Sequence, residues 1–181
     1  MNKIKNILLI FVIFISNYGY SEIKINEGNI SIAFSPNQGG EELIIKVIDT
    51  AKETIRLSGY SFTALNIVKA LLRAHKNGIE VGVLVDHNHN VNSKYSRSAL
   101  NTLSLSGIYT KTVDSYKINH NKFIIVDGIV VQTGSYNYTI SANKSNSENV
   151  IVLWNNPKLA EEYLNHWQQG WEQGIDWKMN Y

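Results

Sequence analysis

Hydrophobic positions along the chain follow alternating strand-like and helix-like patterns. Residues 30–34 alternate weakly and stop at Ser35-Pro36, which predicts a strand that ends in a turn. Residues 39–51 begin with two glycines and two glutamates and continue with apolar residues at helical spacing, which predicts a helix. Residues 79–85 are rich in β-branched side chains, as buried strands are. The same reasoning predicts strands at 54–62, 109–113, 123–126, 129–133 and 150–154, and helices at 64–76, 93–105 and 157–171.

Strands that alternate with helices indicate an α/β protein. Asp127-Gly128 separates the predicted strands 123–126 and 129–133, and Asp-Gly is among the strongest two-residue hairpin signals. An antiparallel hairpin therefore joins strands that are otherwise linked through helices. We expect one α/β domain with a mixed β-sheet flanked by helices.

The first 21 residues differ from the rest of the chain. Lys3 and Lys5 precede an unbroken apolar run, residues 7–15, and small residues follow at Gly19 and Ser21. This order is typical of a secretory signal peptide, with cleavage expected after Ser21. An uncleaved membrane anchor is the alternative, but the run has less than half of the roughly 20 residues that a spanning helix needs. We expect a signal peptide at 1–21, one domain at 22–181, and export to the periplasm or the medium without stable membrane association.

Charge and cysteine content limit the classes of function. The chain has 17 basic and 15 acidic residues, and loss of Lys3 and Lys5 with the signal peptide would leave 15 of each. An anionic ligand must then be held by a local group of cations rather than by the field of the whole protein. The absence of cysteine excludes disulfides and thiolate metal sites.

One short segment gathers residue types that suit attack at phosphorus. The His120 imidazole can act as a nucleophile near neutral pH, and Lys122 can neutralise phosphate oxygens. The hydroxyl of Ser135 and the amide of Asn137 can donate hydrogen bonds to charge that develops in the transition state. Gly134 would let the backbone approach the phosphate closely. The pattern reads His120-x-Lys122-x4-Asp127-x6-Gly134-Ser135-x-Asn137, and it occurs once.

The predicted hairpin places these side chains together. If Asp127 and Gly128 are the only loop residues, the residue numbers of cross-strand partners add up to 255. His120 then faces Ser135, and Lys122 faces Thr133. Directly paired residues project to the same face of a sheet. The register therefore predicts one shared face, which carries His120, Lys122, Ser135 and Asn137.

This pattern resembles the HKD signature of the phospholipase D superfamily. Two further segments, Tyr60-Ser61-Phe62-Thr63 and Ser147-Glu148-Asn149, resemble the branch with one motif per chain, the small bacterial Nuc-type endonucleases. The resemblance extends over residues 30–171. It implies the phospholipase D/nuclease-like fold.

The resemblance also implies a two-step phosphodiesterase mechanism. His120 would attack phosphorus to form a phosphohistidine, while a second histidine protonates the leaving alkoxide and then activates water. In chains with a single motif the second histidine comes from a symmetry mate, which implies a homodimer with both His120 side chains near the two-fold axis. No metal and no cofactor is implied. Glu148 would accept a hydrogen bond from His120, although from sequence alone it could be a solvated charge.

Other candidates are less specific. Asp127 belongs to the motif, but its position in the predicted turn favours a structural role over a catalytic one. Tyr60 and Phe62, at a strand end, could line the catalytic cleft. Trp167 and Trp171 are four residues apart on a predicted helix and share a face, which favours core or dimer packing over base stacking.

A cluster of potential metal ligands, Asp86-His87-Asn88-His89, follows the predicted strand 79–85. Zinc would need further ligands that the sequence does not show, so a loop at the ligand-binding end of the sheet is the favoured interpretation. His87 is then a candidate substrate contact. Lys94 and Arg97 could contact a nucleic-acid backbone or lie on a solvated helix face.

These observations support three hypotheses. The leading one is an exported, metal-independent, nonspecific endonuclease that acts on DNA, with RNA as a further candidate substrate. The second keeps the chemistry but changes the substrate to a phospholipid; the short chain and the lack of a broad apolar stretch argue against it. The third is an inactive nucleic-acid-binding module, against which the intact His120, Lys122 and Asn137 argue.

Overall fold

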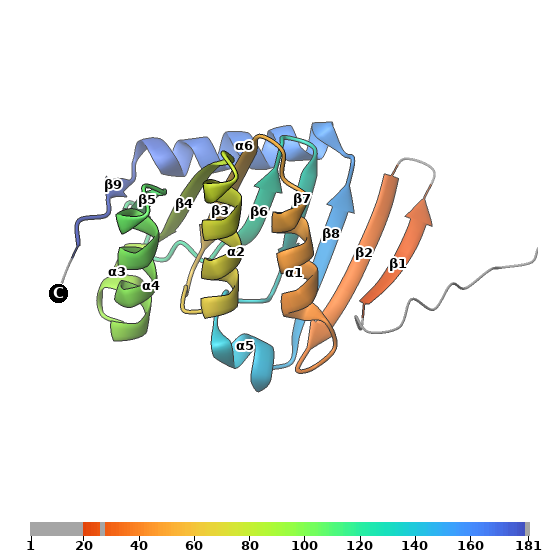
Figure 1. Cartoon of the computed structure of the whole chain (residues 1–181), viewed down its shortest axis with the longest axis horizontal. Helices are drawn as coiled ribbons and strands as arrows, with labels where there is room; N and C mark the ends of the chain where they lie inside the picture. Colours follow the sequence, from red (N-terminus) through yellow and green to blue (C-terminus); the bar gives the residue numbers. More distant parts are fainter. Residues whose placement is uncertain (1–19, 26–27, 180–181) are drawn as a thin grey trace, which may run out of the picture.

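A single mixed β-sheet organises the computed structural model, which describes residues 20–25 and 28–179 (Figure 1). Its nine described strands lie in the order β1-β2-β8-β7-β6-β3-β4-β5-β9. The β3–β4 and β4–β5 pairs are parallel, and all other pairs are antiparallel. The strands are β1 (Tyr20–Ile25), β2 (Gly28–Ser35), β3 (Thr54–Gly59), β4 (Glu80–Asp86), β5 (Tyr109–Val113), β6 (Lys122–Val126), β7 (Val130–Gly134), β8 (Glu148–Trp154) and β9 (Ile175–Asp176).

Helices cover both faces of the sheet. In Figure 1, α1 (Gly40–Asp49), α2 (Leu65–Lys76) and α4 (Lys94–Leu105) lie in front of the sheet, and α6 (Pro157–Glu172) runs behind it along the top. The larger core fills the space under α1, α2 and α4, and a smaller core that includes Phe123 and Trp167 lies under α6. Two short helices, α3 (His87–Val91) and α5 (Ile140–Lys144), follow the ends of β4 and β7. The predicted α/β class with a mixed sheet between helices is confirmed.

The elements that the hydrophobic pattern missed are short or peripheral. α3 and α5 have five residues each and β9 has two, which is too few for a repeating apolar pattern to emerge. β1 lies at the edge of the sheet and pairs only with β2. The strand predicted to reach residue 62 ends at Gly59, because the chain turns away from the sheet there.

The register of the hairpin differs by one residue from the prediction. Val126 pairs with Val130, so paired positions sum to 256 and three residues, 127–129, form the loop. Asp127 and Gly128 adopt the left-handed conformation with φ of 51° and 63°, and Ile129 N donates to Val126 O at 3.0 Å. The expected two-residue turn forms, but Ile129 remains outside the ladder. His120 and Ser135 are therefore not direct partners, and another arrangement must bring the motif together.

The strand ends define one functional end of the sheet. β2, β3, β4 and β7 finish, and β6 and β8 begin, at what we call the site end, where Gly59 pairs with Lys122 and Gly134 pairs with Val150. In doubly wound sheets ligands bind at the carboxyl ends of the parallel strands. Here those are the ends of β3 and β4.

The N-terminal prediction falls outside most of the described chain. Of the expected signal peptide 1–21, only Tyr20 and Ser21 are described, and they begin β1. Across residues 20–25 and 28–179, no helix has the length and apolar character needed to cross a bilayer.

Candidate active site

His120, Lys122 and Tyr60 form a compact group at the site end. The His120 side chain is exposed, and its ring centroid lies 4.7 Å from that of Tyr60. Lys122 is 7% exposed, with its Nζ 5.6 Å from the centre of the Tyr60 ring. Lys122 Nζ also donates a hydrogen bond to His120 O at 2.8 Å. The ammonium group is thus held against the segment that carries the imidazole, and the imidazole itself faces solvent.

Both ionisable groups have lowered pKa values. Partial burial lowers the pKa of His120 below its usual 6.5, the positive charge of Lys122 lowers it further, and Asp86 acts in the opposite direction. Burial lowers the pKa of Lys122, and the charge of Glu148 opposes that shift. A lowered pKa keeps the imidazole neutral, and therefore nucleophilic, near neutral pH.

Asp86 connects the two segments that flank this group. Its side chain is 3% exposed, and its two oxygens accept hydrogen bonds from His89 N and Asn119 N, both at 2.8 Å. One bond caps α3, and the other fixes the residue immediately before His120. The cluster 86–89 is therefore not the predicted loop: Asp86 ends β4, and α3 begins directly after it.

Ser135 and Glu148 form the second part of the site. Ser135 Oγ donates to Glu148 Oε2 at 2.6 Å and accepts from Asn149 N at 3.0 Å. Asn146 Nδ2 donates to Glu148 Oε1 at 3.0 Å. Within the described part of the chain no hydrogen bond joins Glu148 to His120. The expected Glu148–His120 hydrogen bond is absent from this single chain, in which the two carboxylate oxygens accept from Ser135 Oγ and Asn146 Nδ2.

Asn137 lies two residues after Ser135, and the oxygen of its carboxamide has no partner among the described residues. This Oδ1 atom is buried, while the backbone oxygen of Asn137 accepts from Thr139 N at 2.7 Å. The adjacent Tyr138 forms a β-bridge with Phe62. The backbone of this segment is thus fixed, and the buried Oδ1 atom of Asn137 can accept a hydrogen bond.

Gly134 lies in close contact with β8. It has a φ of 147°, and a Cβ atom there would lie 2.3 Å from Asn149 O. Glycine is required because β8 approaches closely, and this contact also brings Asn149 to Ser135. The predicted close approach of the Gly134 backbone to a phosphate stays a prediction.

Of the two aromatic residues expected to line the cleft, only Tyr60 is accessible. Phe62 is 0% exposed, within the larger core, and its ring packs edge-on against Tyr138 at 6.3 Å. The chain has left the sheet after Gly59, which turns Phe62 inward. Phe62 cannot contact a substrate in this conformation.

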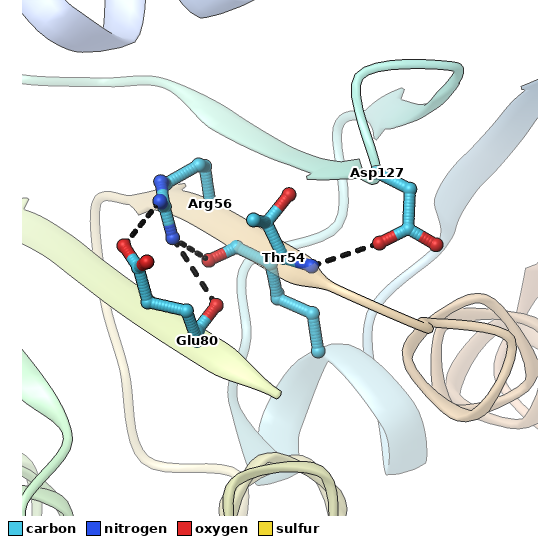
Figure 2. Close-up of polar contacts among 5 residues, drawn as sticks. Thr54, Arg56, Glu80 and Asp127 are labelled. Atoms are coloured by element: carbon cyan, nitrogen blue, oxygen red, sulfur yellow. Dashed lines mark hydrogen bonds and ion pairs between the residues drawn. The ribbon is translucent and has the colours of Figure 1, made fainter. Parts of the chain in front are cut away.

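Asp127 lies at the opposite end of β6 from His120. Its carboxylate accepts hydrogen bonds from the backbone nitrogens of Lys52, Glu53 and Thr54 at 2.8–2.9 Å. Figure 2 shows the bond to Thr54 at the start of β3. These contacts agree with the predicted structural role and separate Asp127 from the chemistry.

The remaining candidates lie around α3 and α4. His87 Nδ1 is 2.9 Å from Thr112 Oγ1, and Arg97 Nη1 donates to Val91 O at 2.8 Å, so both side chains are engaged within the fold. Lys94 is exposed at the start of α4. The described residues contain no group of three or more side chains that could hold a metal ion. The described residues therefore do not supply the further ligands that a metal site at residues 86–89 would need.

Comparison with known proteins agrees with this arrangement. Residues 44–171 match the family model for the cardiolipin synthase, phospholipase D-like domain. The chain belongs to the phospholipase D superfamily. It is similar to a phospholipase D of Rickettsia prowazekii, with 37% identity over 151 residues that cover 83% of this chain and 71% of the relative. It is also similar to a mitochondrial cardiolipin hydrolase of Xenopus tropicalis, with 28% identity over 68% of this chain and 57% of the relative.

Solved structures show the same superfamily fold. Nuc from Salmonella typhimurium, a phospholipase D family member, is 44% identical, with a TM-score of 0.81 over 82% of this chain and 97% of Nuc. NucT from Helicobacter pylori is 22% identical, with a TM-score of 0.73 over 82% of this chain and 98% of NucT, and shares the fold. The predicted resemblance is confirmed at the level of superfamily and fold.

Proposed function

We propose that this protein is a metal-independent phosphodiesterase that cleaves nucleic acid, with DNA as its main substrate. The observation that carries the proposal is the exposed His120 imidazole, held beside Lys122 with a pKa below its usual value. The 44% identity to Nuc supports a nuclease rather than another member of the superfamily.

The residues at the site end suit a two-step displacement. The neutral His120 attacks phosphorus, so that a P–N bond forms while the P–O bond to the leaving alkoxide breaks. A protonated second histidine gives its proton to that alkoxide. The same histidine then takes a proton from water, and the resulting hydroxide displaces His120 from phosphorus. Lys122 and Asn137 stabilise the negative charge of both transition states, and Ser135 contributes when its hydroxyl leaves Glu148 Oε2.

The second histidine in this proposal belongs to another copy of the chain. Two other imidazoles lie near the site: the His89 ring is 4.3 Å from that of Tyr60, and His166 Nε2 is 3.1 Å from Asn121 Nδ2. Within the described residues neither makes a ring contact or hydrogen bond with His120. A two-fold dimer would instead bring two exposed His120 side chains together.

Exposed apolar side chains surround the site end and support such an interface. They come from five separate segments, which follow or precede strands at that end. The residues are Phe34 at 47% exposure, Leu65 at 57%, Tyr95 at 76%, Ile118 at 50% and Ile140 at 58%. We call this set the apolar rim. A dimer interface would remove much of this surface from water.

The apolar rim also favours a second candidate function, the hydrolysis of a phospholipid. The sequence has no broad contiguous apolar stretch, but the fold gathers the rim from distant segments. Similar proteins carry the names phospholipase D and mitochondrial cardiolipin hydrolase. In this case the rim would contact the bilayer while His120 reached the headgroup phosphate.

A paired cleavage assay distinguishes the two candidates. We expect the protein to cleave plasmid DNA in excess EDTA, His120→Ala to abolish cleavage, and His75→Ala, in the last turn of α2, to retain it. Cleavage that requires added metal or survives His120→Ala would contradict the mechanism. Headgroup release from cardiolipin vesicles without DNA cleavage would establish the phospholipid function instead.

Export is a further part of the proposal and rests on the sequence of residues 1–21. Intact-mass measurement of the protein recovered from the periplasm or the medium tests it. We expect a mass that corresponds to a chain beginning at Glu22. The full-length mass in the membrane fraction would support a retained anchor.

A further inference from the structure

A hollow on the α6 face of the sheet lies away from the site end. Arg56, Gly82 and Tyr109 are register partners on the adjacent strands β3, β4 and β5. They face α6, because the alternate residues Ile55 and Leu57 belong to the core on the other side. The hollow has a volume of about 400 Å³, and we call it the α6 hollow. Its lining residues are Arg56, Glu80, Gly82, Tyr109, Trp167, Gln168 and Trp171.

Aromatic rings form the walls of the α6 hollow. Gly82 lets Trp167 lie directly on β4, since a Cβ atom there would be 3.0 Å from the Trp167 ring. Trp171 stacks on Trp167 with a centroid separation of 4.5 Å and an angle of 19° between the rings. Tyr109 stands on the other side of Gly82, 64% exposed and without a hydrogen bond in the described part of the chain. The hollow therefore offers one free ring and a rigid indole pair.

The charges in the α6 hollow are balanced. Arg56 binds the Glu80 carboxylate through Nη2, and its Nη1 atom donates to the backbone oxygens of Ile55 and Glu80 (Figure 2). The guanidinium also lies 5.5 Å from the centre of the Trp167 ring. Because Arg56 is fully engaged, it is poorly placed to capture a phosphate. The Glu80 side chain is 58% exposed, and its second oxygen has no hydrogen-bond donor among residues 20–25 and 28–179.

We propose that the α6 hollow binds a nucleobase, separately from the phosphate chemistry at His120. The base would stack on Tyr109 beside the indole pair, and its ring or amino N–H groups would donate to Glu80 and Gln168. Pockets of this size hold small planar ligands, and aromatic side chains bind bases of any sequence by stacking. The choice of a nucleobase over another planar ring rests on the proposed nuclease function.

The position of the α6 hollow would allow a polynucleotide to make a second contact, away from the candidate active site. Arg56, Glu80 and Tyr109 lie near the first residues of β3, β4 and β5, whereas the candidate active site lies beyond the last residues of β3 and β4. A mononucleotide can occupy one of these places but not both. A polynucleotide that reached both would bind more tightly than either contact alone allows, because the second contact becomes intramolecular.

Nucleoside binding tests the proposal without any cleavage step. Deoxyguanosine and deoxyadenosine lack a phosphate, so binding at His120 and Lys122 does not contribute, and tryptophan fluorescence reports on Trp167 and Trp171. We expect saturable quenching in the wild-type protein and equally in His120→Ala. Tyr109→Ala should weaken binding by about fivefold or more, and Tyr109→Phe should preserve it. Tyr95→Ala removes another exposed tyrosine, from α4 in the apolar rim, and should leave nucleoside binding unchanged.

The outcomes separate this inference from the proposed function. Absence of saturable quenching, an equal response to glucose, or an equal loss in Tyr95→Ala would overturn the nucleobase site. Nucleoside binding in a protein that does not cleave DNA would remove the nuclease function and leave the site. DNA cleavage without nucleoside binding would do the reverse.

Discussion

At the scale of single residues, the main question is how the chain keeps an exposed histidine nucleophilic. Two charges of opposite sign act on the pKa of His120: Lys122 lowers it and Asp86 raises it. Partial burial adds to the effect of Lys122, so the net shift is downward. Two substitutions that each remove one charge should therefore move the His120 pKa in opposite directions.

Lys122→Met should raise the pKa of His120. The substitution removes the positive charge that disfavours the imidazolium, so the neutral form appears only at higher pH. An NMR titration of the His120 ring protons measures this directly and does not depend on residual activity. Lys94→Met, which removes an exposed charge at the start of α4, is the control and should leave the titration unchanged. A His120 pKa that stays the same in Lys122→Met would contradict the coupling.

Asp86→Asn should lower the pKa of His120 and also reduce turnover. The amide cannot replace both charge-assisted bonds to His89 N and Asn119 N, so the segment before His120 loses part of its support. We expect kcat to fall roughly 10- to 100-fold with KM little changed. The acid limb of the pH–rate profile should move to lower pH. Asp114→Asn, an exposed change between β5 and β6, is the matched control.

Residue types and spacing identified His120, Lys122, Ser135 and Asn137, but not the support around them. Asp86 drew attention only as part of a possible metal cluster, because a carboxylate that binds backbone nitrogens has no sequence signature. Phe62 was misassigned because its direction depends on where β3 ends. The partners of Glu148 depend on β2, β7 and β8 meeting at one end, which spacing alone does not specify.

At the scale of elements, the period of the hydrophobic pattern predicted the long helices and the interior strands. The hairpin register failed by one residue because Ile129 lies between the turn and the ladder, and the sequence gives no sign of that extra residue. The site survives this shift, since its geometry depends on strand ends rather than on cross-strand partners. The contact of β7 with β8 at Gly134 is the most demanding part of that geometry.

Gly134→Ala should destabilise the protein strongly. The new Cβ atom would meet the backbone oxygen of Asn149, and the φ of 147° is strained for any other residue. We expect the free energy of unfolding to fall by about 2–4 kcal/mol, measured by urea denaturation. Gly128→Ala is the control, because its Cβ would meet nothing within 4 Å and only its φ of 63° is unfavourable, at about 1 kcal/mol. Equal effects of the two changes would exclude the steric contact with β8.

At the scale of the whole molecule, chemistry and solvent-exposed apolar surface coincide at one end. Apart from Ile118, which lies two residues before His120, the apolar rim comes from distant segments, and only the complete fold brings them to the same end. The sequence predicted a dimer through family resemblance alone. The apolar rim is a surface that could form the dimer interface. The same surface could instead contact a bilayer, as the phospholipid function would require.

A shared active site makes a quantitative prediction for mixed dimers. If each site needs His120 from both chains, an equal mixture of wild-type protein and His120→Ala, refolded together, should have about a quarter of the DNA-cleaving activity of the same total amount of wild-type protein, because random pairing gives one wild-type dimer in about four. Independent sites would retain about half. Ile118→Glu should weaken the dimer, as measured by sedimentation, and should reduce activity in proportion. A fully active monomer would contradict the shared site.

The motif residues at the two ends of β6 should give different mutant phenotypes. His120 and Lys122 lie at the start of the strand, whereas Asp127, just past its end, holds the residues that lead into β3. His120→Ala should be inactive at every temperature. Asp127→Ala should lose about 2 kcal/mol of stability and about 4–8 °C in Tm, as calorimetry would show, with normal turnover per folded molecule. It should therefore behave as a temperature-sensitive allele, and a screen at one warm temperature would misclassify it as catalytically dead.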